Sequence, residues 1–105
     1  MSGSGGGIYM PPQRNDFDCE TSIIISKVSS IDIVVLEKHT DGDVLHVVIG
    51  DKGQVLLEDK DGEILGAILH SNTSDLIECI ENGSEYVAEI RNIDSQVCTV
   101  KIMRS

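Results

Sequence analysis

Three histidines and three cysteines could ligate a zinc ion or form a nucleophile and its base: His39, His46, His70, Cys19, Cys79 and Cys98. Their spacing contains neither a C-x-x-C nor an H-x-x-x-H pair, so it does not match a zinc site. A Cys–His pair for nucleophilic catalysis needs adjacency in the fold rather than in the sequence, and so stays open. However, Cys79 and Cys98 fall in apolar patterns, where a buried thiol is usually inert. The sequence therefore predicts no catalytic residue, no metal site, no cofactor and no enzyme activity.

The number of cysteines bears on the redox environment. An odd number without paired spacing fits a disulfide framework poorly, and reduced thiols are typical of the cytosol. We therefore expect unpaired cysteines and a cytoplasmic location. Cys19 lies in a polar segment and is expected to be the most exposed of the three.

Asp59, Asp61 and Glu63 alternate through a turn and could be calcium ligands. Their spacing does not fit the EF-hand loop, whose glycine follows three oxygen-bearing positions and precedes a glutamate by six residues. A solvated turn is the better interpretation. The glycines between residues 3 and 7 lack the preceding strand and following helix of a phosphate-binding loop.

The chain is strongly acidic, with 8 basic and 18 acidic residues, so its net charge is 8 − 18 = −10. Such a surface repels phosphate backbones, which disfavours nucleic acid as a partner. The acidity also allows another function, in which the protein mimics DNA and occupies the basic groove of a nucleic-acid-binding protein. No apolar run approaches the ~20 residues of a membrane helix, so no membrane contact is expected.

Five residues are candidates for contact with a partner. Arg91 and Lys101 fall on the exposed faces of two predicted strands and Arg104 follows them, so the three could form a basic patch. The alternative is ordinary cross-strand pairing with a carboxylate such as that of Glu89. Tyr9 and Met10 place apolar bulk in a Gly- and Pro-containing segment, which is either a docking peptide or a simple tail.

Two regions are predicted, a flexible lead-in over residues 1–20 and one domain over residues 21–105. An apolar run over 31–36 is either a strand or a helical turn. One short helix is expected over about 75–82, capped by Asp75 and ended by Asn82-Gly83. Asp61-Gly62 predicts a hairpin with a type I′ turn. The expected strands cover about 21–27, 44–49, 54–59, 63–69, 86–91 and 97–103.

These elements predict a mainly β fold. Alternating apolar and polar residues in the last two strands indicate an antiparallel sheet with one buried face. One helix of two turns cannot cover an open sheet of five to six strands. A small, partly open antiparallel barrel with the helix at one end removes the exposed edges.

Residues 42–103 resemble a HIRAN domain. The resemblance lies in Gly42-Asp43-Val44-Leu45, the segment Asp61 to Ile68, the helix ending in Glu81-Asn82-Gly83, and the strand from Tyr86. It implies a small β-barrel and, as in some members, capture of single-stranded DNA ends. The family's Asn-Pro-Tyr-Asp stretch is replaced by Gly50-Asp51-Lys52-Gly53, and its basic and aromatic DNA contacts are missing, so the resemblance supports the fold more than the activity.

We therefore expect a small, non-enzymatic binding module of a bacterial or phage-derived system, whose partner is another protein. Two alternatives stay open: a HIRAN-type module for single-stranded DNA ends, and an acidic DNA mimic.

Overall fold

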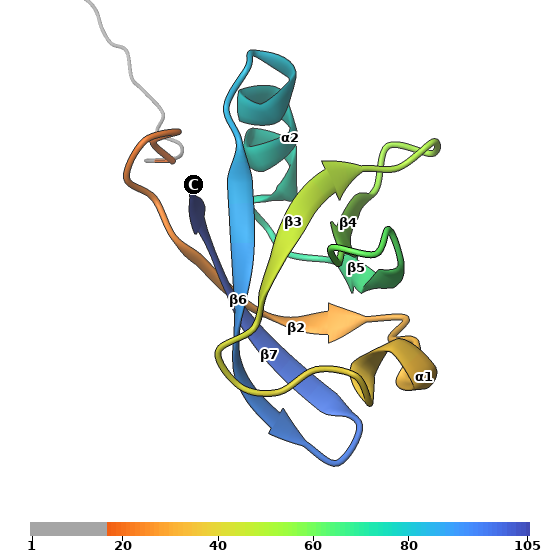
Figure 1. The fold of residues 1–105 in the computed structure, drawn as a ribbon. Coiled ribbons are helices and arrows are strands. Elements are labelled where there is room, and N and C mark those ends of the chain that lie inside the picture. The colour runs from red at the N-terminus through yellow and green to blue at the C-terminus, as the bar shows by residue number, and fades with distance from the viewer. Residues whose placement is uncertain (1–16) are drawn as a thin grey trace, which may run out of the picture.

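The computed structural model describes residues 17–105, so the predictions for Tyr9 and Met10 lie outside the described residues. Residues 17–105 form a closed antiparallel barrel of six strands in the order β2-β5-β4-β3-β6-β7 (Figure 1). The predicted small β-barrel is therefore confirmed. Its elements are β2 (Ile24–Ser29), α1 (Ile33–Leu36), β3 (Val44–Ile49), β4 (Val55–Glu58), β5 (Ile64–Ile68), α2 (Thr73–Glu81), β6 (Tyr86–Asp94) and β7 (Val97–Arg104).

The core fills the barrel with side chains that alternate along the strands. Tyr86, Ala88 and Ile90 of β6 are buried, as the sequence predicts, and so are the even-numbered residues of β7 from 98 to 102. Leu45, Leu57 and Leu65 are fully enclosed and come from three further strands. Because successive strand side chains point to opposite faces, the odd-numbered residues of β7 lie on the outside.

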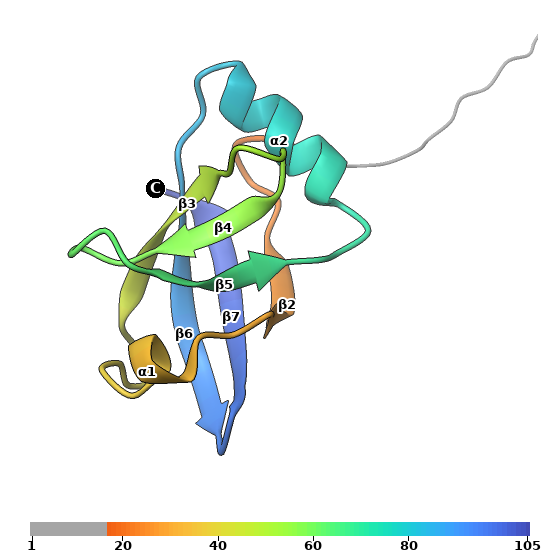
Figure 2. The ribbon, with the colours of Figure 1, turned by 90° about the vertical axis from the view of Figure 1, so that its right-hand side faces the viewer.

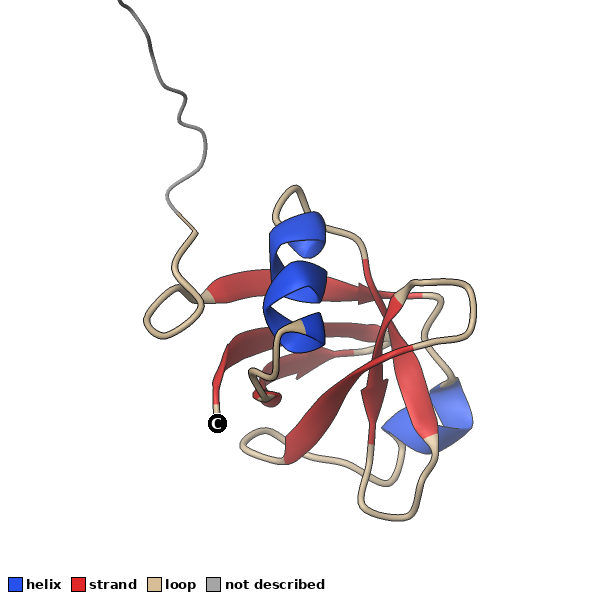
Figure 3. Ribbon diagram, turned by 90° about the horizontal axis from the view of Figure 1, so that it is seen from above, coloured by secondary structure: helices blue, strands red, loops and turns tan. Residues whose placement is uncertain are grey.

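Helix α2 lies over one end of the barrel, and α1 lies at the opposite end (Figures 2 and 3). Leu76 and Cys79 of α2 are buried against the strands, which confirms that the helix closes this end. The predicted cap is wrong, because the N-cap residue is Asn72. Asp75 lies in the first turn of the helix, where its negative charge interacts favourably with the positive end of the helix dipole. The end is as predicted: Gly83 has φ +107°, and Ser84 donates its N–H to the carbonyl of Cys79.

The β3–β4 and β4–β5 hairpins share one turn geometry. In each, the glycine donates its N–H to the residue three positions earlier, Gly53 to Gly50 and Gly62 to Asp59. In each of these two turns only the closing glycine has positive φ, since Ser30 and Ser95 are the only non-glycine residues with that conformation in the described chain. The type I′ turn predicted for Asp61-Gly62 is therefore wrong, and the geometry is that of a type I turn followed by a left-handed glycine.

The ambiguous segment before β3 is a helical turn. Asp32 caps α1, because its Oδ1 accepts the N–H groups of Val34 at 3.0 Å and Val35 at 3.2 Å. Val35 and Leu36 then point into the core, while Val34 is exposed. Four helical residues position the chain for its return into β3.

The seam that closes the barrel is short. Between β2 and β5 the register contains only the pairs Val28↔Ile68 and Ser29↔Ala67, whereas β2 pairs with β7 from Ile24 to Lys27. Gly66 allows this contact, because a Cβ there would clash with the side chain of Val28 and the carbonyl of Ser29. Strands β2 and β5 can therefore pair closely because residue 66 has no side chain.

Within residues 17–105 no helix is long and apolar enough to cross a membrane.

Candidate functional site

The outer face of β2 carries large aliphatic side chains that face solvent. Ile24 is buried inside the barrel, so alternation turns its neighbours Ile23 and Ile25 outward, where they are 52% and 61% exposed. Leu69 directly follows β5, whose residue Ile68 pairs with β2, and is 73% exposed. We call Ile23, Ile25 and Leu69 the β2 apolar face. Clustered apolar exposure of this kind marks contact with a partner more often than single scattered residues do.

Two lysines border the β2 apolar face. Lys101 of β7 lies directly opposite Ile25 in the register, and Lys27 lies two residues further along β2 on the same outer side. Neither amine belongs to any of the ion pairs formed within residues 17–105. The apolar face is therefore flanked by two cations that form no ion pair with the described residues, although the chain is strongly acidic.

Two of the three predicted basic residues, Arg91 and Lys101, adjoin the same carboxylate, that of Glu89, whereas Arg104 pairs with Glu20. Arg91 is the extra residue of a bulge in β6, between the pairs Ile90↔Val100 and Asn92↔Thr99, and lies 3.8 Å from Glu89. Lys101 is opposite Glu89 on the outer face of β7. Arg104 follows the inward-facing positions of β7 and pairs with Glu20 instead. Of the three, only Lys101 adjoins the β2 apolar face, and the binding role of all three stays a prediction.

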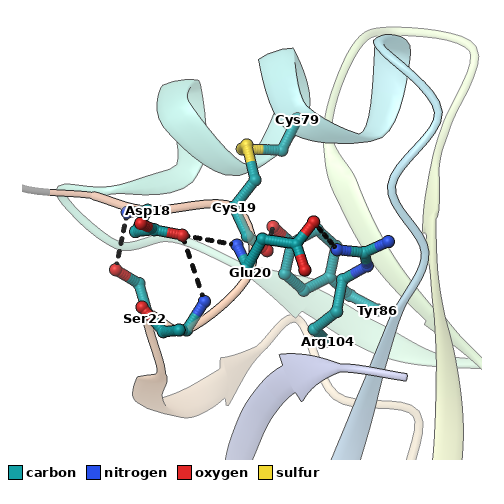
Figure 4. Close-up of a disulfide and its surroundings, with 8 residues drawn as sticks. Asp18, Cys19, Glu20, Ser22, Cys79, Tyr86 and Arg104 are labelled. Atoms are coloured by element: carbon teal, nitrogen blue, oxygen red, sulfur yellow. Dashed lines mark hydrogen bonds and ion pairs between the residues drawn. A yellow bond between two sulfur atoms is a disulfide. The ribbon is translucent and has the colours of Figure 1, made fainter.

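A disulfide joins Cys19 to Cys79 of α2, as Figure 4 shows. The prediction of unpaired cysteines is therefore wrong for this pair. Cys79 is buried and Cys19 half-buried, while Cys98 is free and fully enclosed in the barrel, so Cys19 is the most exposed of the three, as expected. Burial raises the pKa of the Cys98 thiol. Neither a cross-linked sulfur nor an enclosed thiol offers an accessible nucleophile.

Polar contacts hold the residues around Cys19 on the barrel. The Tyr86 hydroxyl donates to the carbonyl of Cys19 at 2.6 Å, and burial raises the pKa of this tyrosine. Nη1 of Arg104 lies 2.7 Å from Oε2 of Glu20, and this ion pair raises the pKa of the arginine (Figure 4). Asp18 orders the turn, since its Oδ1 accepts the N–H of Glu20 at 2.7 Å. The described end of the predicted lead-in is thus attached to α2, β6 and β7.

His39 connects two carboxylates at the other end of the molecule. Its Nδ1 lies 2.9 Å from Oδ2 of Asp43, and its Nε2 lies 3.3 Å from Oδ2 of the buried Asp59. The hydrogen bond from His39, with the N–H of Thr40, lowers the pKa of Asp43. The pKa of Asp59 is lowered chiefly by the N–H of Glu63 and then by His39. These contacts join the end of α1 to β3 and to the β4–β5 turn.

The lowered pKa values predict a loss of stability in acid. A carboxylate whose pKa is lowered by folding stabilises the protein above its unfolded pKa, about 3.9 for aspartate, and the contribution is lost as pH falls through the folded pKa. Below about pH 4, the thermal midpoint of the wild type should therefore fall more steeply than that of Asp43→Asn. Asp51→Asn, at an exposed turn, is the matched control. Parallel slopes for wild type and Asp43→Asn would contradict the role of this network.

The acidic turn is held by the protein's own donors. The oxygens of Asp59, Asp61 and Glu63 come within 4.8 Å of one another. However, Oδ1 of Asp59 accepts the backbone N–H groups of Asp61 and Glu63, both at 2.9 Å, and Glu63 forms an ion pair with Lys38 at 2.6 Å. This arrangement orders a hairpin turn, in line with the interpretation favoured from the sequence.

The sequence contained one signal for the β2 apolar face. Three successive isoleucines cannot all point into a barrel, because strand side chains alternate, so at least one of Ile23, Ile24 and Ile25 had to be exposed.

Comparisons with protein families, with curated proteins and with solved structures found no match for this chain.

Proposed function

We propose that this protein is a small, non-enzymatic module that binds another protein through the β2 apolar face. The observation that carries this proposal is the exposure of Ile23, Ile25 and Leu69, each more than half exposed, on or next to the paired strands β2 and β5. A typical aliphatic side chain gains about 1.5–3 kcal/mol when fully buried, so covering this face would favour association. The amines of Lys27 and Lys101 at its border, which form no ion pair within residues 17–105, would add selectivity more than affinity.

Removing one aliphatic side chain tests this proposal. Short random peptides displayed on phage are selected on the immobilised protein, and the affinities of the enriched peptides are measured by titration. Ile25→Ser should weaken binding about tenfold or more, because burial of one side chain is worth at least about 1.4 kcal/mol. Val34→Ser is the matched control, since Val34 is 66% exposed on α1. If enriched peptides bind Ile25→Ser as tightly as wild type, the β2 apolar face is not the binding surface.

The DNA-end alternative is tested by a separate titration. A labelled single-stranded DNA with a free 3′ end should show no saturable change in fluorescence anisotropy at low or physiological salt, because Arg91 and Arg104 already face Glu89 and Glu20. Saturable binding that weakens with salt would instead favour the HIRAN-type activity. The HIRAN resemblance and an origin in a bacterial or phage-derived system stay proposals.

The cytoplasmic location also stays a proposal. Its argument from the sequence was unpaired cysteines, and the Cys19–Cys79 disulfide removes that argument, since stable disulfides are mainly found in oxidising compartments. The DNA-mimic alternative is supported here only by the net charge of −10.

A further inference from the structure

Among residues 17–105, the first half of β2 has one strand neighbour instead of two. Ile24 to Lys27 pair with Thr99 to Ile102 of β7, but the pairs with β5 begin only at Val28. After Ile68 the chain leaves β2 and runs toward α2 (Figure 2). Since the backbone groups of a strand point alternately to its two sides, half of the N–H and C=O groups of Ile24–Lys27 face the side without a strand. Within the described chain, β2 therefore keeps a short open edge inside a barrel that is otherwise closed.

An open edge restricts the chemistry of its occupant. Unpaired N–H and C=O groups at the spacing of a strand are matched by another extended polypeptide, which is how peptides add to sheet edges in several recognition domains. Small molecules, nucleic acids and lipids do not carry this repeating pattern of donors and acceptors. The edge therefore favours a peptide in strand conformation.

The side chains around the edge restrict the sequence of that peptide. A strand added beside Ile24–Lys27 places every second side chain on the outer surface, next to Ile23, Ile25 and Lys27 in turn. Aliphatic residues match the two isoleucines. A carboxylate matches the amine of Lys27, which has no ion-pair partner within residues 17–105. The positive charge of Lys27 stands out on a chain that is acidic as a whole. It would favour a peptide with an acidic residue at the position next to Lys27.

We infer that β2 binds an extended peptide segment of a partner protein by strand addition, and that the segment carries aliphatic residues and one acidic residue at alternate positions. This inference rests on the proposed function and specifies its partner and its mode of binding. Two separate observations support it: the short β2–β5 seam, and the amine of Lys27, which forms no ion pair within residues 17–105.

Backbone N-methylation of a selected peptide tests the mode of binding. In an added strand every second peptide N–H points toward β2, so single N-methyl groups should weaken binding about tenfold at alternate residues and have little effect between them. Replacing the acidic residue by glutamine should weaken binding to wild type but not to Lys27→Ala. Both results together support strand addition with charge pairing at Lys27.

Other outcomes separate this inference from the proposed function. Peptides that depend on Ile25 but show no alternating N-methyl effect would overturn strand addition and leave the binding function standing. Selection of no peptide above background would overturn both. Concentration-dependent dimerisation that is abolished by Ile25→Ser would show that a second copy of this chain occupies the edge, which also overturns the inference.

Discussion

Reduction of the Cys19–Cys79 disulfide should lower the free energy of unfolding by about 4 kcal/mol. The two cysteines are 60 residues apart, and a cross-link over such a distance removes much of the conformational freedom of the unfolded chain. The same bond attaches residues before β2 to α2, so its loss should also loosen the end of the barrel that α2 covers. Urea unfolding with and without a dithiol reductant measures the effect.

Cys19→Ser is the control for this experiment. It should match the reduced wild type in stability and should not respond further to reductant, because no disulfide remains in it and both Cys79 and Cys98 are then free thiols. Denatured, unreduced wild-type protein should titrate one free thiol. Titration of all three cysteines would contradict the disulfide.

Leu76→Ala should lower the free energy of unfolding by about 2–5 kcal/mol, the usual range for a fully buried leucine. Leu76 is 0% exposed and fixes α2 over the end of the barrel, so its truncation leaves a cavity between the helix and the strands. Denaturant unfolding of wild type and variant gives the difference directly. A loss of this size would establish that α2 is part of the core and not a mobile cover.

Leu69→Ala makes the same chemical change at an exposed position. Because Leu69 is 73% exposed, its truncation should change stability by no more than about 0.5 kcal/mol. It should nevertheless weaken binding of the selected peptides, since Leu69 belongs to the β2 apolar face. Equal losses of stability from both variants would contradict the difference in burial.

Local patterns were sufficient to predict much of the fold. The period of two in β6 and β7 identified which side chains are buried, and Asn82-Gly83 identified the end of α2. Barrel closure followed from the small area that one short helix can cover. The cap of α2 was mispredicted because Asn72 and Asp75 are both good capping residues. The helix begins after Asn72, about one turn before the start that a cap at Asp75 would give.

The site was less accessible to sequence reasoning, because it depends on contacts between distant residues. Nothing near Cys19 indicates that Cys79 is its partner. The apolar run Ile23–Ile25 indicates a strand but not which of its residues face the barrel interior. That assignment depends on the register with β7, and the open edge depends on where the pairing with β5 stops. Arg91 lies in a bulge, which periodicity alone does not reveal.

The most direct test of the proposed binding face is a nuclear magnetic resonance titration of the isotope-labelled protein with a selected peptide. We predict that the backbone amide signals of Ile23 to Lys27, Leu69 and Lys101 shift with the peptide, while those of α1 and the β4–β5 turn stay in place. Shifts centred on His39 and the β4–β5 turn, with β2 unaffected, would contradict it.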